Sequence, residues 1–273
     1  LPRHISPHAS GILISEKSIH CYSATLLPPK GFPTTQFSML EAEDIGLYKF
    51  DILSQRGLGK IKDTLSILKN NQGIRIDIHQ VEAFKQDEEV KELLRHGKTI
   101  GCFYVESPAM RMLLTKLGAD DYLRLVAASS IIRPGVSKSG MMREYILRYR
   151  HPHLREKARQ ALPELYALLE ETYGVMVYQE DVIKIALHYA GMEAAYGDIL
   201  RRAISGKSRS LEELNRVKEH FFNCCKEKNH PLNLSQEVYR QIESFAGYSF
   251  CKAHSAGFIL LSTSRVYSIP LLA

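Results

Sequence analysis

The sequence predicts an α+β protein that is mainly α, in which a small mixed α/β segment precedes a larger all-helical region. The extended apolar segments GILIS (residues 11–15) and LYKFDIL (residues 47–53) both lie before residue 57, and apolar residues at helical spacing dominate after it. The 273 residues are 45% hydrophobic, which is enough for a sizeable core. We expect one domain over residues 1–60 and a second over residues 61–273.

The apolar segment over residues 47–53 carries charges at alternate positions. Side chains alternate across a strand, so Lys49 and Asp51 share one face. Tyr48, Phe50 and Ile52 share the other face, which we expect to pack in the core. The preceding connection, residues 26–37, contains three prolines and a glycine, and we expect no regular structure there.

Helix signals follow one another after residue 57. Ile61, Leu65 and Leu68 recur at helical spacing. Ser107 and Gly118 are typical of a helix N-cap and a C-terminal stop, and Pro108 suits the first helical position. Other expected helix starts are Asp87, Ser210 (a capping box with Glu213) and Ser235, and the apolar stretch over residues 254–269 is expected to be a buried helix.

Composition narrows the classes of partner. The net charge of +6 favours a polyanion such as nucleic acid or a nucleotide, although a basic soluble enzyme of another class has the same balance. No apolar run approaches the ~20 residues of a membrane span, so we expect no membrane partner. The five cysteines include no C-x-x-C pair, which predicts free thiols in a reducing cytoplasm. Adjacent Cys224 and Cys225 point in different directions on a helix, which disfavours a zinc site.

Lys49 and Asp51 are the first candidates for chemistry. A carboxylate on a rigid strand is a suitable Mg²⁺ ligand, and a lysine beside it can hold phosphate oxygens. A two-metal site for phosphoryl transfer needs further carboxylates. The residues alone leave a second interpretation open, which is an ordinary Lys–Asp ion pair on the surface of an edge strand.

Three groups of basic residues are suited to binding phosphate. The segment LRRAISGKSRS (residues 200–210) surrounds a Ser-Gly turn with cations, and FAGYSFCKAHSAGF (residues 245–258) opens a helix with Lys252, His254 and Ser255. A solvated helix face is the alternative for the third group, which contains Arg133, Lys138, Arg143, Arg148, Arg150, Arg155, Lys157 and Arg159 against Glu144 and Glu156.

The chain resembles the bacterial C-family DNA polymerase, the DNA polymerase III α subunit, over nearly its whole length. The segments that carry the resemblance are RHISPHASGILIS, TTQFSMLEAEDIGLYKFDIL, IRPG, ETYGVMVYQEDVIKIA, LRRAISGK and FAGYSFCKAHSAGF, in this order. The resemblance implies that residues 1–60 are the C-terminal part of a nucleotidyltransferase-like palm and that residues 61–273 are helical fingers.

The resemblance also implies site residues. Asp51 would be a catalytic carboxylate and metal ligand in a two-metal Mg²⁺ site, and Lys49 would lie near the incoming triphosphate. Nucleotide- or DNA-binding roles are implied for Arg133, Arg201, Arg202, Lys207, Lys252, His254 and Ser255.

The implied partners are primer-template DNA, an incoming deoxynucleotide and other subunits of a cytoplasmic replisome. The D-x-D motif that supplies the family's other catalytic carboxylates is not found in this sequence, so we expect residues outside the chain to complete the metal site and the isolated chain to be inactive. Departures at Ser54–Gln55 and after IRPG leave open whether the polymerase is replicative or an accessory, error-prone version.

Two rival functions remain to be distinguished. A non-enzymatic, basic helical module would bind DNA by charge alone and would not respond to nucleotide and Mg²⁺. A metal-dependent hydrolase would turn over its substrate as the isolated chain.

Overall fold

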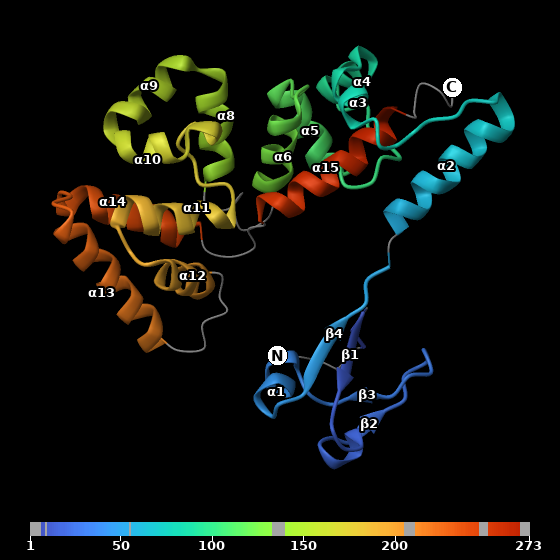
Figure 1. The fold of residues 1–273 in the computed structure, drawn as a ribbon, viewed down its shortest axis with the longest axis horizontal. Coiled ribbons are helices and arrows are strands. Elements are labelled where there is room, and N and C mark those ends of the chain that lie inside the picture. The colour runs from blue at the N-terminus through green and yellow to red at the C-terminus, as the bar shows by residue number, and fades with distance from the viewer. Residues whose placement is uncertain are drawn as a thin grey trace. The chain divides into compact units, whose positions relative to one another are not determined.

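The computed structural model describes residues 7, 8, 10–54, 56–132, 140–204, 211–245 and 251–267. The chain divides into two compact units, unit 1 over Leu1–Lys60 and unit 2 over Ile61–Ala273. Figure 1 shows short strands in unit 1 and helices in unit 2, so the fold is α+β and mainly α, as the sequence predicts. Among the described residues, none of the helices combines the length and the apolar character of a membrane span.

Unit 1 is built from two small antiparallel sheets and a short helix. Strand β1 pairs with β4 and strand β2 pairs with β3. Helix α1 begins after a capping box, in which the Ser38 side chain accepts from the Glu41 N–H and the Glu41 carboxylate accepts from the Ser38 N–H. The bounds are β1 Gly11–Ile14, the 3₁₀ turn η1 Ile19–Cys21, β2 Thr25–Leu26, β3 Thr34–Thr35, α1 Met39–Asp44 and β4 Tyr48–Asp51.

Two expectations for unit 1 are wrong. Tyr48, Phe50 and Ile52 are 67%, 54% and 68% exposed, because no described element covers that face of the β1–β4 pair. Alternation identifies the residues that share a face and carries no information about what packs on it. The segment over residues 26–37 also contains a short ladder, in which Leu26 pairs with Thr34, so only the proline-rich connection between them is irregular.

Unit 2 is an assembly of helices. Helix α2 (Arg56–Gln72) crosses the boundary between the units and buries Ile61 and Leu68, as its spacing predicts. The elements that follow are α3 Val81–Gln86, α4 Glu88–Arg95, α5 Pro108–Leu117, α6 Tyr122–Ile131, α8 Met141–Arg150, α9 Pro152–Ala161, α10 Pro163–Leu168, η2 Glu170–Thr172, α11 Gln179–Lys184, the π-helix η3 Ile185–Ala190, α12 Ala194–Arg202, α13 Leu211–Glu227, α14 Leu232–Ser244 and α15 Lys252–Tyr267.

Helix termini in unit 2 mostly follow local sequence. Asp87 caps α4 by accepting from the Val90 N–H, and Ser107 caps α5 by accepting from the Met110 N–H. Gly118 ends α5 in the left-handed region (φ 57°), which confirms the expected stop. The start at Ser235 is wrong, because α14 begins at Leu232 and Ser235 is buried within it. The capping box expected at Ser210 lies outside the described residues.

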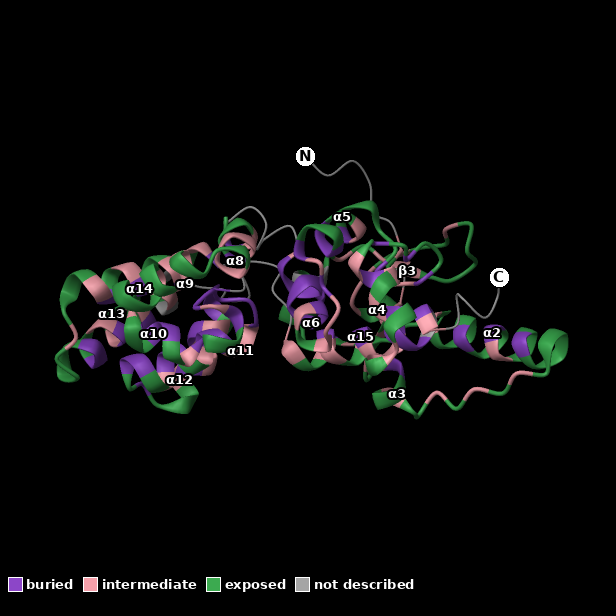
Figure 2. Ribbon diagram, turned by 90° about the horizontal axis from the view of Figure 1, so that it is seen from above, coloured by how far each residue is buried: buried purple, intermediate pink, exposed green. Residues whose placement is uncertain are grey.

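One part of the core of unit 2 lies where α15 packs on α6, α3 and α4. Buried side chains from α6 include Val126 and Ile131, and those from α15 include Ile259 and Val266. Figure 2 shows that the described residues of α6 are largely buried, in purple, whereas those of α9 are exposed or intermediate. The buried helix expected near the end of the chain is therefore confirmed over its described residues.

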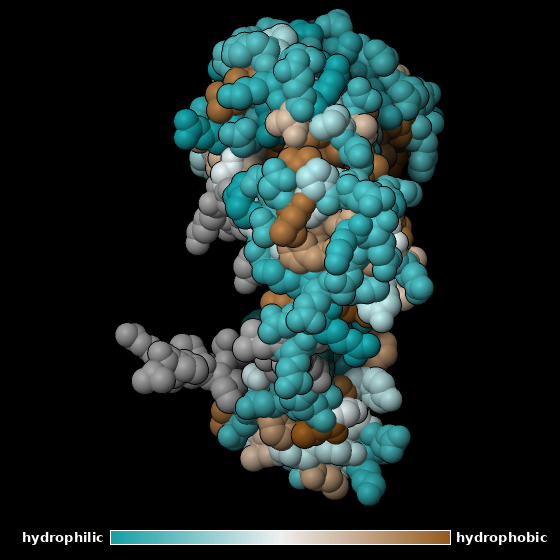
Figure 3. Space-filling model, turned by 90° about the vertical axis from the view of Figure 1, so that its left-hand side faces the viewer, coloured by the Kyte–Doolittle hydropathy of each residue, from teal (hydrophilic) through white to brown (hydrophobic). Residues whose placement is uncertain are grey.

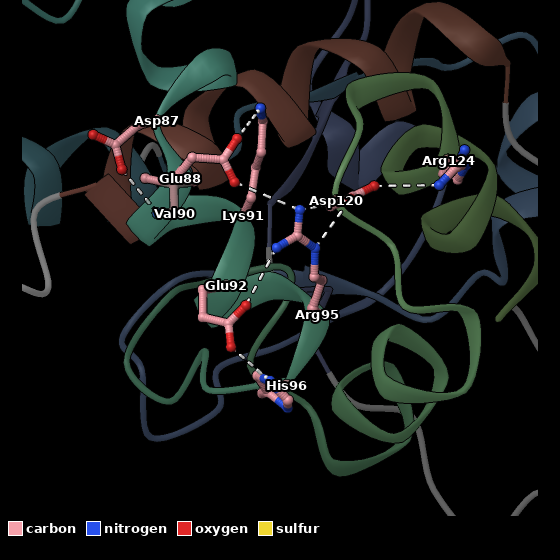
Figure 4. A network of polar contacts seen from close by, with 9 residues as sticks. All are labelled: Asp87, Glu88, Val90, Lys91, Glu92, Arg95, His96, Asp120 and Arg124. Carbon is pink, nitrogen blue, oxygen red and sulfur yellow. Dashed lines mark hydrogen bonds and ion pairs between the residues drawn. The ribbon is translucent and has the colours of Figure 1, made fainter.

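A polar network joins α4 to the loop before α6, as Figure 4 shows. The Arg95 guanidinium lies 2.9 Å from an Asp120 carboxylate oxygen and also reaches Glu92 and Glu88. Asp120 in turn accepts from Arg124 on α6. Arg95 and Asp120 are 25 positions apart in the sequence, so the network joins segments that are neighbours only in the fold.

Candidate functional site

Asp51 lies at the end of β4, opposite Gly11 of β1. Its carboxylate is 43% exposed and is directed to the same face as Lys49, whose Nζ lies 2.9 Å from Asp51 Oδ2. The two side chains therefore meet as strand alternation predicts, and the carboxylate is accessible to solvent.

The other carboxylate oxygen of Asp51 faces the segment that precedes β1. The Ser10 hydroxyl donates to Oδ1 at 3.2 Å. His8 Nδ1 lies 3.6 Å from Oδ1 and accepts from the Gly11 N–H at 2.7 Å. A nitrogen that accepts an N–H carries no proton of its own, so His8 and Asp51 are neighbours here and not an ion pair.

The hydrogen bond from the Lys49 ammonium, together with its charge and a hydrogen bond from Ser10, lowers the pKa of Asp51 below its ordinary value. Asp51 is consequently ionised at neutral pH. An ionised, exposed carboxylate on a strand has the charge and donor atoms that a hard divalent cation takes.

The described residues provide only part of a magnesium site. Asp51 supplies carboxylate oxygens, and no group of three or more His, Cys, Asp or Glu in the described part of the chain is placed to hold a metal ion. Asp51 thus fits as one ligand of a hard cation, and the remaining oxygen ligands would have to come from other groups or from water.

In unit 2, Arg201 and Arg202 lie at the C-terminal end of α12. Both guanidinium groups bind Asp198 one turn earlier, at 2.7 Å and 3.0 Å. Arg201 also donates to Gln179 Oε1 at 3.3 Å. The structure thus places these two candidates side by side on one carboxylate.

Lys252 is the first residue of α15, as the sequence predicts. Its backbone N–H donates to both carboxylate oxygens of Glu180, at 3.1 Å and 3.0 Å, and its ammonium pairs with Glu171. The anion site expected at this helix terminus is therefore filled by side chains of the protein itself.

His254 and Ser255 follow Lys252 on α15 but face different surroundings. The His254 ring is half-buried and packs against Phe258 and Tyr104. Ser255 is fully buried, and its Oγ lies 2.7 Å from the hydroxyl of Ser130 on α6. Ser255 therefore holds α15 against α6 and is not part of a surface in this arrangement. Arg133 and Lys207, the remaining candidates, lie outside the described residues.

Several members of the basic group over residues 133–159 serve the fold. Arg148 donates to the carbonyls of Tyr173 and Gly174, both at 3.0 Å. Arg155 donates to the Tyr149 carbonyl and lies over the Tyr173 ring. These contacts are internal, so the count of cations in the sequence overstates the charge that this group presents to a polyanion.

Sequence reasoning missed the residues that connect the candidates in unit 2. Gln179 and Glu180 contact Arg201 and Lys252, and the buried Asp181 accepts from the N–H groups of Val177 and Tyr178. The available signal was the segment ETYGVMVYQEDVIKIA, which contributed to the resemblance without a role for any of its residues.

The face drawn in Figure 3 is largely hydrophilic, with apolar residues in small separate areas. Cysteines give no sign of a further site: Cys102, Cys224 and Cys225 are buried free thiols, Cys21 is exposed and Cys251 is half-buried. Burial raises the pKa of the Cys224 and Cys225 thiols, so both are protonated at neutral pH.

Comparison with known proteins decides the family. Residues 57–229 match the family model described as the bacterial DNA polymerase III alpha subunit finger domain. The chain belongs to the bacterial DNA polymerase III alpha subunit family. Residues 1–54 match the model of the alpha NTPase domain of the same subunit, so the α subunit family accounts for both units.

Individual members of the α subunit family are similar along almost the whole chain. DNA polymerase III subunit alpha of Aquifex aeolicus (strain VF5) is 36% identical over 267 residues, which cover 98% of this chain and 22% of that protein. The corresponding subunit of Staphylococcus aureus (strain COL) is 37% identical over 258 residues, which cover 94% of this chain and 23% of that protein. The chain thus spans less than a quarter of the length of these curated relatives.

Proposed function

We propose that this chain is part of a DNA-directed DNA polymerase, and that Asp51 is one of its catalytic carboxylates. Family membership supports the reaction class, and the exposed, ionised Asp51 beside Lys49 is the observation that supports the site. In the reaction, the primer 3′ oxygen forms a bond to the α-phosphorus of the incoming deoxynucleotide. The bond from that phosphorus to the bridging oxygen breaks, and pyrophosphate leaves.

The cofactor proposed for the reaction is Mg²⁺ in a two-metal site, to which Asp51 contributes carboxylate oxygens. Bound Mg²⁺ would activate the primer oxygen and stabilise charge on the leaving group. Lys49 neutralises Asp51 in the present arrangement, at 2.9 Å. When Asp51 binds a cation instead, the Lys49 ammonium becomes available to triphosphate oxygens a few ångströms away.

The basic residues of unit 2 are proposed to bind phosphates of the nucleotide and of primer-template DNA. Arg201 and Arg202 lie in the last turn of α12, and Lys252 and His254 lie in the first turn of α15. Arg133 and Lys207 are added to the proposal from the sequence. Ser255 would act indirectly, by holding α15 against α6. Partnership with other replisome subunits in the bacterial cytoplasm follows from this role.

Primer extension by the full-length gene product tests the proposal. Asp51→Ala should reduce extension by about 10³-fold or more, because a water that takes the place of the carboxylate on the metal supplies no negative charge to hold it. The matched control is Glu16→Ala, an exposed acid of the same unit that lies outside β4 and should leave extension unchanged. Retained extension by Asp51→Ala would exclude the proposed role.

The same protein distinguishes the charge-only alternative. Binding to primer-template DNA is titrated with salt, with and without the next deoxynucleotide and Mg²⁺. A polymerase should form a tighter complex when the correct nucleotide is present, whereas a module that binds by charge alone should show the same salt dependence under both conditions.

A further inference from the structure

The segment over residues 171–181 contacts basic residues at the end of α12 and at the start of α15 in unit 2. Gln179 accepts from Arg201 on α12, and Glu180 accepts from the backbone N–H of Lys252 on α15. Glu171, at the other end of the segment, pairs with the Lys252 ammonium. One short stretch of chain thus connects the ends of two helices that lie 22 and 72 residues further along the sequence.

This segment is itself held firmly. Tyr173 and Gly174 both adopt the left-handed region, with φ of 57° and 74°, and Arg148 binds their two carbonyls. The next residues, Val175 to Tyr178, are at most 4% exposed. Asp181 then accepts from the N–H groups of Val177 and Tyr178, both at 2.8 Å. Gln179 and Glu180 are therefore presented from a rigid base.

The start of α15 depends on Glu180 for hydrogen bonding. The first N–H groups of a helix have no partner within the helix. Cys251 supplies only a sulfur acceptor, 3.4 Å from the His254 N–H, which is a weak interaction. Both carboxylate oxygens of Glu180 accept a hydrogen bond from the Lys252 N–H. The negative charge of Glu180 also interacts favourably with the positive end of the helix dipole. Glu180 consequently determines where the backbone of Lys252 lies.

We propose that Glu180 is a positioning residue for the nucleotide, which acts by fixing the first turn of α15 and with it Lys252 and His254. This inference rests on the proposed polymerase function. Glu180 does not touch the nucleotide itself, because its carboxylate is occupied by the helix terminus. Loss of Glu180 would let the first turn of α15 fray, and Lys252 would spend less time where it binds phosphate.

Kinetics of nucleotide incorporation by the full-length gene product test the inference. Glu180→Ala should raise the KM for the deoxynucleotide by about 10-fold and change kcat much less, because the chemical step uses other residues. Glu180→Gln keeps an acceptor oxygen for the Lys252 N–H and should recover most of the loss. Glu170→Ala, which removes an exposed neighbouring acid 73% accessible to solvent, should behave like the unsubstituted protein.

A double-mutant cycle separates positioning from general damage. If Glu180 acts through Lys252, Glu180→Ala should add little to the KM of a Lys252→Met protein. Additive effects in the cycle, or an equal loss for Glu180→Gln and Glu180→Ala, would overturn the inference. A lower KM for Glu180→Ala would also overturn it, since that result would identify Glu180 as a competitor that the triphosphate displaces.

The unsubstituted protein also distinguishes a failure of the positioning role from a failure of the proposed polymerase function. If the unsubstituted full-length protein does not extend primers, the proposed function fails. If it extends primers and Glu180→Ala has an unchanged KM, only the positioning role fails. Thermal unfolding of each variant identifies a protein that has lost its fold. If Glu180→Ala does not fold, the KM of Glu180→Gln is measured in its place.

Discussion

Asp51 and Asp181 are the same residue type in opposite circumstances. Asp51 lies on a two-stranded sheet of unit 1 with its carboxylate 43% exposed, and Asp181 lies in the core of unit 2 with its side chain 3% exposed. A lysine lowers the pKa of Asp51, whereas burial raises the pKa of Asp181 in spite of two backbone hydrogen bonds. Because it is exposed, Asp51 is suited to binding a cation. Because it is buried, Asp181 is suited to accepting hydrogen bonds from backbone N–H groups.

The contrast extends to the units that carry the two residues. Unit 1 leaves Ile12, Tyr48 and Phe50 about half exposed or more, and a two-stranded sheet has little core of its own. Unit 2 buries a continuous apolar cluster and uses arginines and carboxylates to fix its turns. Substitutions in unit 1 should therefore reduce primer extension more than they reduce stability. Substitutions in the core of unit 2 should reduce stability more than they reduce primer extension.

The largest expected effect on stability comes from Asp181. Asp181→Ala leaves the N–H groups of Val177 and Tyr178 buried without an acceptor and should lower the free energy of unfolding by about 3 kcal/mol. Urea unfolding followed by the helical circular dichroism signal measures the loss. Asp51→Ala is the matched control and should shift the midpoint much less, because its ion pair with Lys49 is exposed to solvent and screened by it. Equal midpoints for the two variants would contradict the comparison.

Two glycines in left-handed conformations provide a second comparison between the stability of unit 1 and that of unit 2. Gly174 in unit 2 has φ 74°, and a Cβ there would lie 2.7 Å from the Tyr166 ring, whereas Gly31 in unit 1 has φ 79° and open space around it. Gly174→Ala should cost about 2–3 kcal/mol of unfolding free energy, and Gly31→Ala about 1 kcal/mol from backbone strain alone. Urea unfolding of both proteins measures the difference, and a smaller cost at Gly174 would show that Tyr166 yields freely.

The two aspartates should also titrate on opposite sides of the ordinary carboxyl range. NMR of the carboxyl carbons is expected to place the pKa of Asp51 below that range and the pKa of Asp181 above it. The stabilising contribution of Asp51 is present above its unfolded-state pKa and is lost as pH falls through its lowered folded-state pKa. For Asp181 the native state binds the proton more tightly, so stability falls as pH rises from the unfolded-state pKa to the raised one.

Asp181→Asn removes the pH dependence of stability that comes from Asp181, so this variant is the control for it. The stability of the unsubstituted protein relative to Asp181→Asn should decrease as pH rises from about 3 to 7. A constant difference between the two proteins over this interval would show that Asp181 titrates normally.

The smallest effect is expected in the network on α4. Glu88 is 71% exposed, and its contacts with Lys91 and Arg95 are screened by water and salt. Glu88→Gln should leave the urea midpoint unchanged within error at any salt concentration. A clear loss at low salt only would show that the network in Figure 4 contributes to holding α4 against the loop before α6.

Local rules predicted much of the architecture because they act within a few residues. The caps at Asp87 and Ser107, the stop at Gly118 and the shared face of Lys49 and Asp51 each follow from neighbours along the chain. Ser235 has the same cap preference but lies inside α14, which begins at Leu232 directly after Pro231 at the N-cap position. Propensity identifies suitable caps, and packing selects among them.

By itself, the sequence determined the mainly helical α+β class, the alternation that puts Lys49 beside Asp51, and the motif order that points to the polymerase α subunit family. Only the tertiary structure decided that Tyr48 and Phe50 are exposed, that Ser255 is a core hydroxyl, and that Glu180 caps a helix 72 residues away. The physical reason is range: alternation and capping depend on adjacent residues, whereas burial and long-range hydrogen bonds depend on which distant segments pack together.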